Sequence, residues 1–432
     1  MTVGIVGAGI TGLALTHYCR ERGVDAVAFE ASSEPGGVIS SSRVDGCVLE
    51  HGPQRTRLTP AIEGLVDDCG LRSDLRTADT DLPLYVYADG RLRQVPFSPR
   101  VFLSTDLLSL RGKVRMLAEP LTEGARDDET AADYFVRKFG REAYHNLVEP
   151  LFGGIYGSDP AEMPGKYALQ TVRKMERSGS LVRAAVNRRL EGKERQPPVS
   201  FDGGMAQLPQ GLYEHNADRV ELETPVERIA SEGTGYRLET DEGSHVVDHV
   251  VVTTRADVAA GLLADVDAGS ARALRRLYYN PLAYVHLHSE ADPAGYGYQV
   301  RHDEPLHTLG VTWNASLFDR DGVYTCFLGG MENPGMVDRS ERELGRIAVE
   351  EFEAVLGASA AVLNVTKHPR GIPAYDGSWT AMEDVNLPDG VTLASNYAGR
   401  MGVPARVREA KRLAERFAEA EAEASPAVAA TG

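Results

Sequence analysis

The sequence predicts an α/β protein of two domains, one of them a discontinuous Rossmann-like domain that binds a dinucleotide. Three observations lead to this prediction. Residues 2–30 have the pattern of a strand, a helix and a second strand around a glycine-rich turn. Strand-like sequence returns in the middle of the chain, and a strand, a short loop and a helix follow near its end. Because 432 residues exceed what one hydrophobic core usually supports, the blocks inserted between these parts would form the second domain.

Composition narrows the class of protein. Apolar residues make up 42 % and charged residues 25 %, which is typical of a soluble globular chain. The net charge of −17 argues against a nucleic-acid partner. With no run of 18 apolar residues and no basic segment before the first strand, we expect a cytoplasmic protein without a signal peptide. The scattered Cys19, Cys47, Cys69 and Cys326 predict free thiols and no metal site.

The expected elements follow the hydrophobic pattern along the chain. The first unit is strand Thr2–Val6, helix Ile10–Arg22 and strand Ala26–Glu30, and residues 127–195 are mostly helical, with a loop over 188–198. Strands are then expected at Val220–Glu223 and Val226–Ile229, and a hairpin pairs Tyr236–Thr240 with His245–Thr253, followed by a helix at Val258–Leu263. The remaining expected elements are four strands within residues 283–330, a helix over Glu341–Leu356, strand Val391–Ser395, a helix from Val403, and a frayed tail over Ala418–Gly432.

The turn after the first strand carries the most specific local motif. Gly7-Ala8-Gly9-Ile10-Thr11-Gly12 is a G-x-G-x-x-G motif between a strand and a helix. Its glycines permit the tight turn, the close approach of a pyrophosphate and the packing of the helix on the strand. The helix N-terminus then offers free N–H groups and the positive end of its dipole to the phosphates.

The next strand indicates which dinucleotide is bound. Glu30 ends this strand, where its carboxylate can accept both ribose hydroxyls, and a carboxylate there disfavours NADP. Gly36 and Gly37 follow closely and would let the chain pass beneath a long, extended cofactor, and the segment Gly52-Pro53-Gln54 gives a further backbone approach. These features favour FAD over NAD.

Several segments resemble a known family. Glu30-Ala31 followed by Gly36-Gly37 is similar to the flavin amine oxidase superfamily. Within it, the chain resembles the protoporphyrinogen/coproporphyrinogen oxidases in five collinear segments: residues 147–160 (LVEPLFGGIYGSDP), 201–209 (FDGGMAQLP), 327–330 (FLGG), 372–375 (IPAY) and 395–397 (SNY). The sequence departs from that family where Ser395 replaces a glycine and where the last loop, Gly402-Val403-Pro404-Ala405-Arg406, lacks the usual Gly-Asp-Cys.

The resemblance implies a function, a set of contacts and a domain plan. It implies oxidation of protoporphyrinogen IX or coproporphyrinogen III in haem biosynthesis, with oxygen or another carrier as electron acceptor. The FAD contacts that the motifs and the resemblance imply are Gly7, Ala8, Gly9, Ile10, Thr11, Gly12, Glu30, Ala31, Gly36, Gly37, Val38, Gly52, Pro53, Gln54, Arg55, Val226, Trp379, Met401, Gly402 and Val403. The expected FAD domain comprises residues 1–80, 199–270 and 381–418, with a helical cap over 81–198, an antiparallel substrate sheet over 271–380 and the tail 419–432.

Substrate recognition is less constrained by the sequence. Propionates call for arginines, and Arg57, Arg100 and Arg173 are the candidates by position. No catalytic side chain is identified, and His17, His51, His145 and His302 are expected to have surface or capping roles. Three alternatives stay open: an amine oxidase, although residues 283–330 contain no lysine, a phytoene-type desaturase, and a flavin-binding protein without turnover.

Residues 97–121 combine apolar and basic side chains. The segment mixes Phe, Leu and Met with Arg100, Arg111, Lys113 and Arg115, in a chain that is acidic as a whole. This composition, and the resemblance, predict a cap over the substrate site that contacts a membrane peripherally and reversibly. The oligomeric state is left undetermined by the sequence.

Overall fold

A five-stranded parallel sheet is assembled from three separate stretches of the chain. The computed structural model describes residues 1–176, 179–190 and 195–424. The order of the strands in the sheet is β10 (Val220–Glu221), β2 (Asp25–Phe29), β1 (Thr2–Val6), β14 (His249–Val252) and β20 (Val391–Leu393). Every pairing in it is parallel. The prediction of a discontinuous Rossmann-like fold is therefore confirmed.

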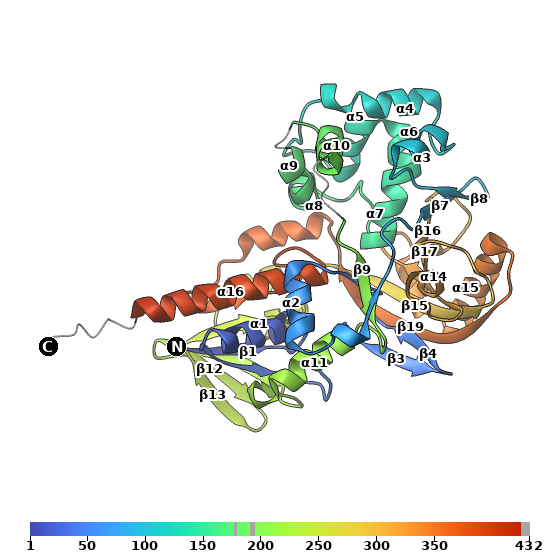
Figure 1. The fold of residues 1–432 in the computed structure, drawn as a ribbon. Coiled ribbons are helices and arrows are strands. Elements are labelled where there is room, and N and C mark those ends of the chain that lie inside the picture. Colours follow the sequence, from blue (N-terminus) through green and yellow to red (C-terminus); the bar gives the residue numbers. More distant parts are fainter. Residues whose placement is uncertain (177–178, 191–194, 425–432) are drawn as a thin grey trace.

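Both faces of this sheet are covered, as the apolar runs of its strands require. Val3 and Ile5 of β1 face a core formed with α1 (Ile10–Glu21) and α16 (Val403–Ala424), while Val6 faces a second core. The first core also includes α2 (Pro60–Asp68) and α11 (Gln207–His215), and Figure 1 shows α1 and α16 side by side. The second core contains α12 (Ala256–Leu262), α13 (Ala268–Leu274) and the antiparallel strands β11 (Val226–Glu232), β12 (Gly235–Thr240) and β13 (Gly243–Val247).

The predicted hairpin is shorter than expected. β12 pairs with β13 from Thr240–Gly243 to Tyr236–Val247, but the residues that follow leave this sheet and form β14 against β1. Asp248 lies at the switch, where its Oδ2 accepts a hydrogen bond of 2.7 Å from the N–H of Thr2. Both strands are rich in valine, so their composition does not show that they belong to different sheets.

A seven-stranded sheet forms the core of the second domain. Its order is β19 (Ala360–Pro373), β15 (Tyr279–Ser289), β18 (Val323–Gly329), β17 (Thr308–Trp313), β16 (Gly297–Val300), β7 (Leu84–Ala88) and β8 (Arg91–Gln94). All neighbours are antiparallel except β16 and β7. Helix α15 (Glu341–Leu356) packs on the sheet and begins with a capping box of Ser340 and Glu343. Strands β7 and β8 thus extend the substrate sheet, and within residues 81–198, the expected cap and substrate region, only the part after β8 is helical.

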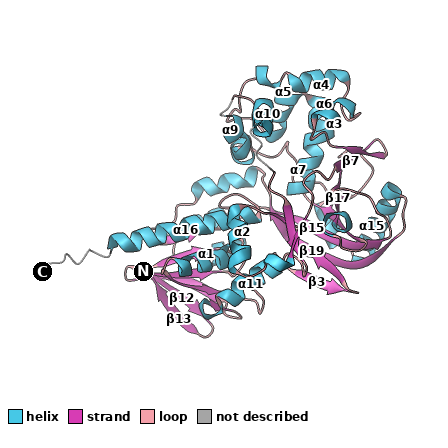
Figure 2. Ribbon diagram, viewed as in Figure 1, coloured by secondary structure: helices cyan, strands magenta, loops and turns pink. Residues whose placement is uncertain are grey.

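The helices of residues 99–190 form a separate block above the seven-stranded sheet (Figures 1 and 2). They are α3 (Pro99–Ser104), α4 (Leu110–Leu117), α5 (Ala131–Phe139), α6 (Arg141–Ala143), α7 (Glu149–Tyr156), α8 (Gly165–Ala168), α9 (Gln170–Glu176) and α10 (Leu181–Leu190). Inside the block, the buried Lys138 pairs with Glu119 at 2.8 Å and with Glu176 at 2.7 Å. We refer to these helices as the helical block.

Two boundaries differ from expectation. Helix α10 continues to Leu190, beyond the predicted start of a loop at residue 188. Helix α16 continues to Ala424, so residues 418–424 of the predicted frayed tail are helical, and residues 425–432 lie outside the described part. Alanine and glutamate both favour a helix, which explains the extension.

One buried carboxylate joins the two domains. Glu50 ends β4 (Cys47–Glu50), which pairs with β3 (Ser41–Val44), and its side chain is 1 % exposed. It forms an ion pair of 2.7 Å with Arg320, which follows α14 (Asn314–Phe318), and accepts hydrogen bonds from Ser41 and from the N–H of Met205. A third small sheet lies beside it, formed by β5 (Thr56–Arg57), β9 (Pro198–Phe201) and β6 (Leu75–Thr77).

We predict that Arg320→Leu lowers the free energy of unfolding by about 3 kcal/mol, because it leaves the Glu50 carboxylate buried without its countercharge. Denaturant unfolding followed by circular dichroism measures this loss. The matched control is Arg346→Leu, which breaks the exposed Arg346–Glu350 pair on α15 and should cost less than about 1 kcal/mol. Equal losses in the two variants would contradict the role given to Glu50.

Candidate functional site

The glycine-rich turn between β1 and α1 has the backbone geometry of a phosphate loop. Gly7 adopts a φ of +103°, a conformation that a side chain disfavours. A Cβ on Gly12 would lie 2.0 Å from the carbonyl oxygen of Gly7, whereas a Cβ on Gly9 would meet no other atom closer than 4.0 Å. Gly9 is the N-cap of α1, and no side chain caps this helix. The first N–H groups of α1 are therefore available to an anion.

Glu30 lies beside this loop with its carboxylate already oriented. Its Oε2 accepts a hydrogen bond of 2.7 Å from the N–H of Ala8, and its Oε1 accepts one of 3.0 Å from the N–H of Ser32. A carboxylate offers about four acceptor positions, so capacity remains for hydroxyl donors. The N–H of Thr224, two residues before Val226, donates to the carbonyl of Glu30 and brings the start of β11 next to it.

We call the surface formed by the loop Gly7–Gly12 and Glu30 the cradle. The second glycine pair, Gly36 and Gly37, and the segment after β4 extend it. The N–H of Gly36 donates to the carbonyl of Ala8 at 2.8 Å, and Gly36 forms a bridge with Gly9. A Cβ on Gly52 would lie only 1.8 Å from the carbonyl oxygen of Val38. Val38 itself is 59 % exposed, so its side chain is open to contact with a ligand in the cradle. The structure thus brings Gly9, Gly36, Val38 and Gly52 together.

The start of α16 packs into the same core as the start of α1. Val403 belongs to the same hydrophobic core as Ile10 and Ile39. Gly402 adopts a φ of +99°, and a Cβ there would meet nothing within 4 Å. A Cβ would not fit at Gly12 or Gly52, where the backbone packs against itself, whereas Gly9 and Gly402 have open space beside them. This combination suits a chain that wraps around a long dinucleotide. The residues present therefore fit FAD.

A cavity of about 490 Å³ opens where the helical block meets the start of α16. Tyr375 and Trp379 stack in one wall with ring centroids 4.3 Å apart, and Tyr156 meets Tyr375 edge-on. Burial raises the pKa of Tyr375 to about 12. The remaining lining residues are Met163, Tyr167, Ala168, Gln170, Met382, Tyr397, Ala398, Gly399, Arg400, Met401, Pro404, Ala405 and Arg408.

None of the three arginines predicted to bind substrate lines this cavity. Arg57 is exposed and donates to the carbonyl of Gln196, and Arg100 is exposed on α3. Arg173 pairs with Asp127 at 2.7 Å and with the carbonyl of Arg126, so its guanidinium is committed within the helical block. The arginines that do line the cavity are Arg400 and Arg408, which the family motifs do not mark.

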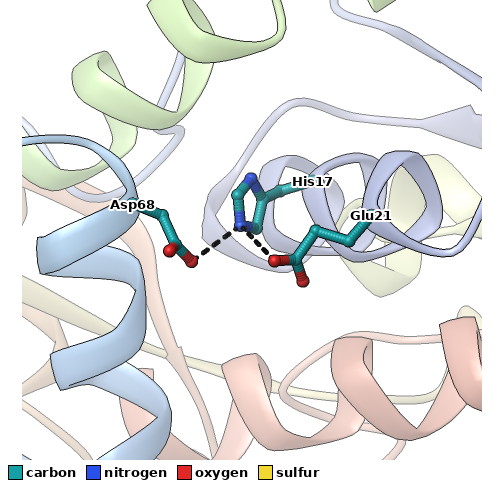
Figure 3. A group of neighbouring side chains, drawn as sticks. All are labelled: His17, Glu21 and Asp68. Carbon is teal, nitrogen blue, oxygen red and sulfur yellow. Dashed lines mark hydrogen bonds and ion pairs between the residues drawn. The ribbon is translucent and has the colours of Figure 1, made fainter.

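Two of the four histidines, His17 and His51, differ from expectation. His145 pairs with Glu149 at 2.8 Å and His302 with Glu332 at 2.5 Å, while His17 is 1 % exposed. The Nε2 of His17 lies 3.1 Å from Asp68 and 3.9 Å from Glu21, so these three residues tie α1 to α2 (Figure 3). The surface role predicted for His17 is therefore wrong.

The donor set of His17, Glu21 and Asp68 resembles a metal site, but one feature argues for a hydrogen-bonded ion cluster. A metal on Nε2 would place the proton on Nδ1, and a metal-bound histidine ordinarily donates that proton to a partner. The Nδ1 of His17 is buried and has no hydrogen-bond partner. If the proton is instead on Nε2 and is donated to Asp68, Nδ1 is left as an unpaired acceptor and not as an unpaired donor, and this arrangement costs less free energy.

His51 is the histidine that lies closest to the cradle. It directly precedes Gly52, and both of its ring nitrogens are engaged, Nδ1 with Thr366 at 2.8 Å and Nε2 with Ser42 at 2.7 Å. Burial and the neighbouring His368 lower its pKa. The expected surface role is wrong here also, because His51 links the FAD domain to β19. The alternating polar residues Asn364, Thr366 and His368 were the sequence signal that could have revealed this link.

Comparisons with known proteins agree with this geometry. A family model for flavin containing amine oxidoreductases matches residues 10–416. The chain is 27 % identical to the chloroplastic protoporphyrinogen oxidase of Nicotiana tabacum, covering 95 % of this chain and 84 % of that one. It is 25 % identical to the coproporphyrinogen III oxidase of Bacillus subtilis, covering 86 % and 87 %.

Solved structures show the same fold at low identity. A protein from Exiguobacterium sp. 255-15, provisionally assigned as a protoporphyrinogen oxidase, superposes with a TM-score of 0.79 at 24 % identity, over 97 % of this chain and 99 % of that one. Putrescine oxidase with bound putrescine superposes with a TM-score of 0.72 at 18 % identity, over 96 % and 98 %.

We predict that Gly9→Val folds normally and loses FAD. The φ of −70° at Gly9 suits any residue, and the space above it is open, so the side chain would occupy only the room that a pyrophosphate needs. Flavin absorbance per mole of purified protein measures the loss, and circular dichroism checks the fold. The control is Gly64→Val, a position in α2 that also has open space, which should purify with a full complement of flavin. Full flavin content in Gly9→Val would refute this location for the pyrophosphate.

Proposed function

The chain belongs to the flavin containing amine oxidoreductase family and is an FAD-dependent oxidoreductase, and we propose that it oxidises a porphyrinogen to the porphyrin. The substrate would be protoporphyrinogen IX or coproporphyrinogen III, the compounds named in its relatives from Nicotiana tabacum and Bacillus subtilis. Similarity to both runs over most of the chain, which supports a related substrate as well as a related cofactor.

The cavity beside α16 is the observation that carries the proposal. A porphyrinogen presents apolar pyrrole rings and carries propionates at its edge. The stacked Tyr375 and Trp379 offer a flat apolar wall, and Arg400 and Arg408 offer guanidinium groups for carboxylates. Arg408 is exposed on α16 and forms no ion pair with the described residues. The buried hydroxyl of Tyr397 has no hydrogen-bond partner among them, so a bound ligand could supply one.

We propose the following roles for the residues of the cradle. The loop from Gly7 to Gly12 and the first turn of α1 bind the pyrophosphate, and Glu30 accepts hydrogen bonds from a ribose. The segment from Gly52 to Arg55 lies against the flavin end, and Met401, Gly402 and Val403 place the start of α16 near it. FAD held by these residues would supply the oxidising power for three two-electron rounds, each of which removes a hydride from a bridging carbon and releases one proton from the macrocycle to solvent. Oxygen would reoxidise the flavin after each round and leave as hydrogen peroxide. The aromatic wall excludes water and orients the macrocycle, while the arginines fix its propionates.

The position of lysine in the substrate sheet speaks against an amine as substrate. The strands of the seven-stranded sheet, all of them within the described residues, contain a single lysine, Lys367 of β19. Its Nζ donates to the carbonyl of Arg339, outside the cavity. A lysine near the flavin is the feature that the resemblance to amine oxidases would have required.

Anaerobic mixing with each porphyrinogen tests the proposal. We predict that the flavin absorbance bleaches with protoporphyrinogen IX or coproporphyrinogen III, and that porphyrin fluorescence develops when air is admitted. Arg408→Leu should raise the KM of the preferred substrate about tenfold with little change in kcat, because it removes a contact made equally in ground and transition states. Arg416→Leu, further along α16 and away from the cavity, is the control. A flavin that dithionite bleaches and neither porphyrinogen reduces would refute the substrate while leaving the cofactor in place.

We further propose that the helical block contacts a membrane peripherally through α3, α4 and the residues after them. Six large apolar side chains are exposed within this short stretch: Phe97, Leu103, Leu110, Val114, Leu117 and Leu121, with exposed fractions from 51 % to 89 %. The basic residues Arg100 and Arg111 are exposed among them. None of the described helices is long and apolar enough to cross a membrane. An apolar patch with a basic rim supports binding to the surface of an anionic bilayer.

We predict that the protein floats with vesicles containing anionic lipid and that the double variant Leu110→Glu/Leu117→Glu stays in the soluble fraction. Glutamate at these exposed positions removes apolar contact and repels the lipid headgroups without disturbing the core. Val246→Glu is the control, because Val246 is 60 % exposed on β13, away from the helical block, and should float as the wild type does. A wild-type protein that fails to float at both low and high salt would refute membrane contact.

A further inference from the structure

The carbonyl groups of Glu50, His51 and Gly52 are all held by side chains. His286 Nε2 donates to the carbonyl of Glu50 at 2.9 Å, and His368 Nε2 donates to that of His51 at 2.7 Å. Gln54 Nε2 donates to the carbonyls of both Glu50 and Gly52 at 3.1 Å. Three successive peptide units at the predicted flavin contact therefore have their orientation fixed by side chains. Those of Glu50 and His51 are held by histidines from distant strands, and that of Gly52 by Gln54 of the same segment.

The histidines in this group come from the substrate sheet. His286 lies on β15 and His368 on β19, and Thr366 shares the face of β19 that His368 occupies, since the two are separated by one residue. Thr366 accepts a hydrogen bond of 2.9 Å from Asn364, which leaves its hydroxyl proton for Nδ1 of His51. We call His51, His286, His368 and Thr366 the histidine bracket.

The three histidines of the bracket are neutral and largely buried. Burial lowers the pKa of all three histidines, and that of His286 falls to about 4. The rings of His51 and His286 lie with centroids 5.4 Å apart, which also disfavours two positive charges. At neutral pH each ring carries one proton, and because a carbonyl only accepts, that proton is on Nε2 in His286 and His368.

Fixing a carbonyl also fixes the N–H of the following residue. In a trans peptide the C=O of one residue and the N–H of the next point in opposite directions, and every described peptide bond is trans. Because the carbonyl of His51 points to His368 on β19, the N–H of Gly52 points away from β19. Gly52 is buried, and its N–H donates to no other described residue. A buried N–H without a partner is rare and costly, so it indicates a ligand that is bound in the working protein.

We propose that the histidine bracket positions the N–H of Gly52 as a hydrogen-bond donor to the flavin ring, and that His51, His368 and Thr366 are positioning residues that set the reduction potential. The proposal rests on the placement of FAD given above and does not depend on the identity of the substrate. Reduction adds electron density to the acceptor atoms of the flavin, so a donor held toward them stabilises the reduced form more than the oxidised form. A bracket that loosens would let the peptide unit turn and weaken this preference.

The test measures the midpoint potential of the bound flavin by dithionite titration against reference dyes, which requires no substrate. His368→Leu and Thr366→Val should lower the potential, and a tenfold loss of preference for the reduced flavin corresponds to about 30 mV for a two-electron couple. His368→Gln keeps an N–H donor at the position of Nε2 and should retain most of the wild-type potential. His307→Gln, an exposed histidine outside the bracket, is the control and should not change it.

The outcomes are distinguishable. Wild-type potentials in both His368→Leu and Thr366→Val, or an equal fall in His368→Gln and His368→Leu, would overturn the proposal. If His368→Leu fails to fold, the isosteric Thr366→Val still decides. A shifted potential in a protein whose flavin no porphyrinogen reduces would support the bracket and refute only the proposed substrate.

Discussion

The buried carboxylate of Glu50 is the point at which the two domains become one structure. It pairs with Arg320, which lies between α14 and β18 of the substrate domain, and accepts hydrogen bonds from Ser41 of the neighbouring strand and from the N–H of Met205, more than 150 residues away. Such a group is costly to bury, and it is tolerated only because these donors satisfy it. The next residue, His51, begins the segment that faces the cradle. Interactions of two successive residues, Glu50 and His51, thus set the position of the cradle relative to the substrate sheet.

Backbone and side chains have separate tasks in this protein. At the phosphate loop the groups available to a ligand are the N–H groups of the first turn of α1, and glycines in place of larger side chains leave room beside them. At the segment from Glu50 to Gln54 the same need for directed N–H groups is met in another way, since long side chains from β15 and β19 hold the carbonyls. The first arrangement follows from local sequence. The second depends on strands that are more than 200 residues distant.

This difference explains what the sequence could predict. The phosphate loop, Glu30 and the start of α16 lie in short motifs whose geometry is local, so their spacing predicted both the fold and the proximity of Gly9, Gly36 and Glu30. The arginines of the cavity could not be found in this way, because Arg100 and Arg173 have the right chemistry but their side chains point to solvent or to Asp127. His51 was misjudged for the same reason: its partners on β19 become neighbours only when the seven-stranded sheet forms. Composition also could not show that β7 and β8 leave the helical segment to extend that sheet, or that β14 leaves the hairpin.

The helical block has an inner surface that lines the cavity and an outer surface that exposes apolar side chains. These two surfaces bear on the route by which a substrate would reach the cavity. Its inner side supplies Tyr156, Met163 and Tyr167 to the cavity, while its outer side exposes the apolar residues of α3 and α4. Of the two proposed substrates, protoporphyrinogen IX has fewer carboxylates and is the more apolar, so a block that rests on a bilayer would shorten the path of that substrate to the aromatic wall. The internal rigidity of the block then matters, because the buried Lys138 with its two glutamates keeps the two surfaces in a constant relation. A loosely packed cap would bind the membrane equally well but would not keep the stacked Tyr375 and Trp379 covered against water.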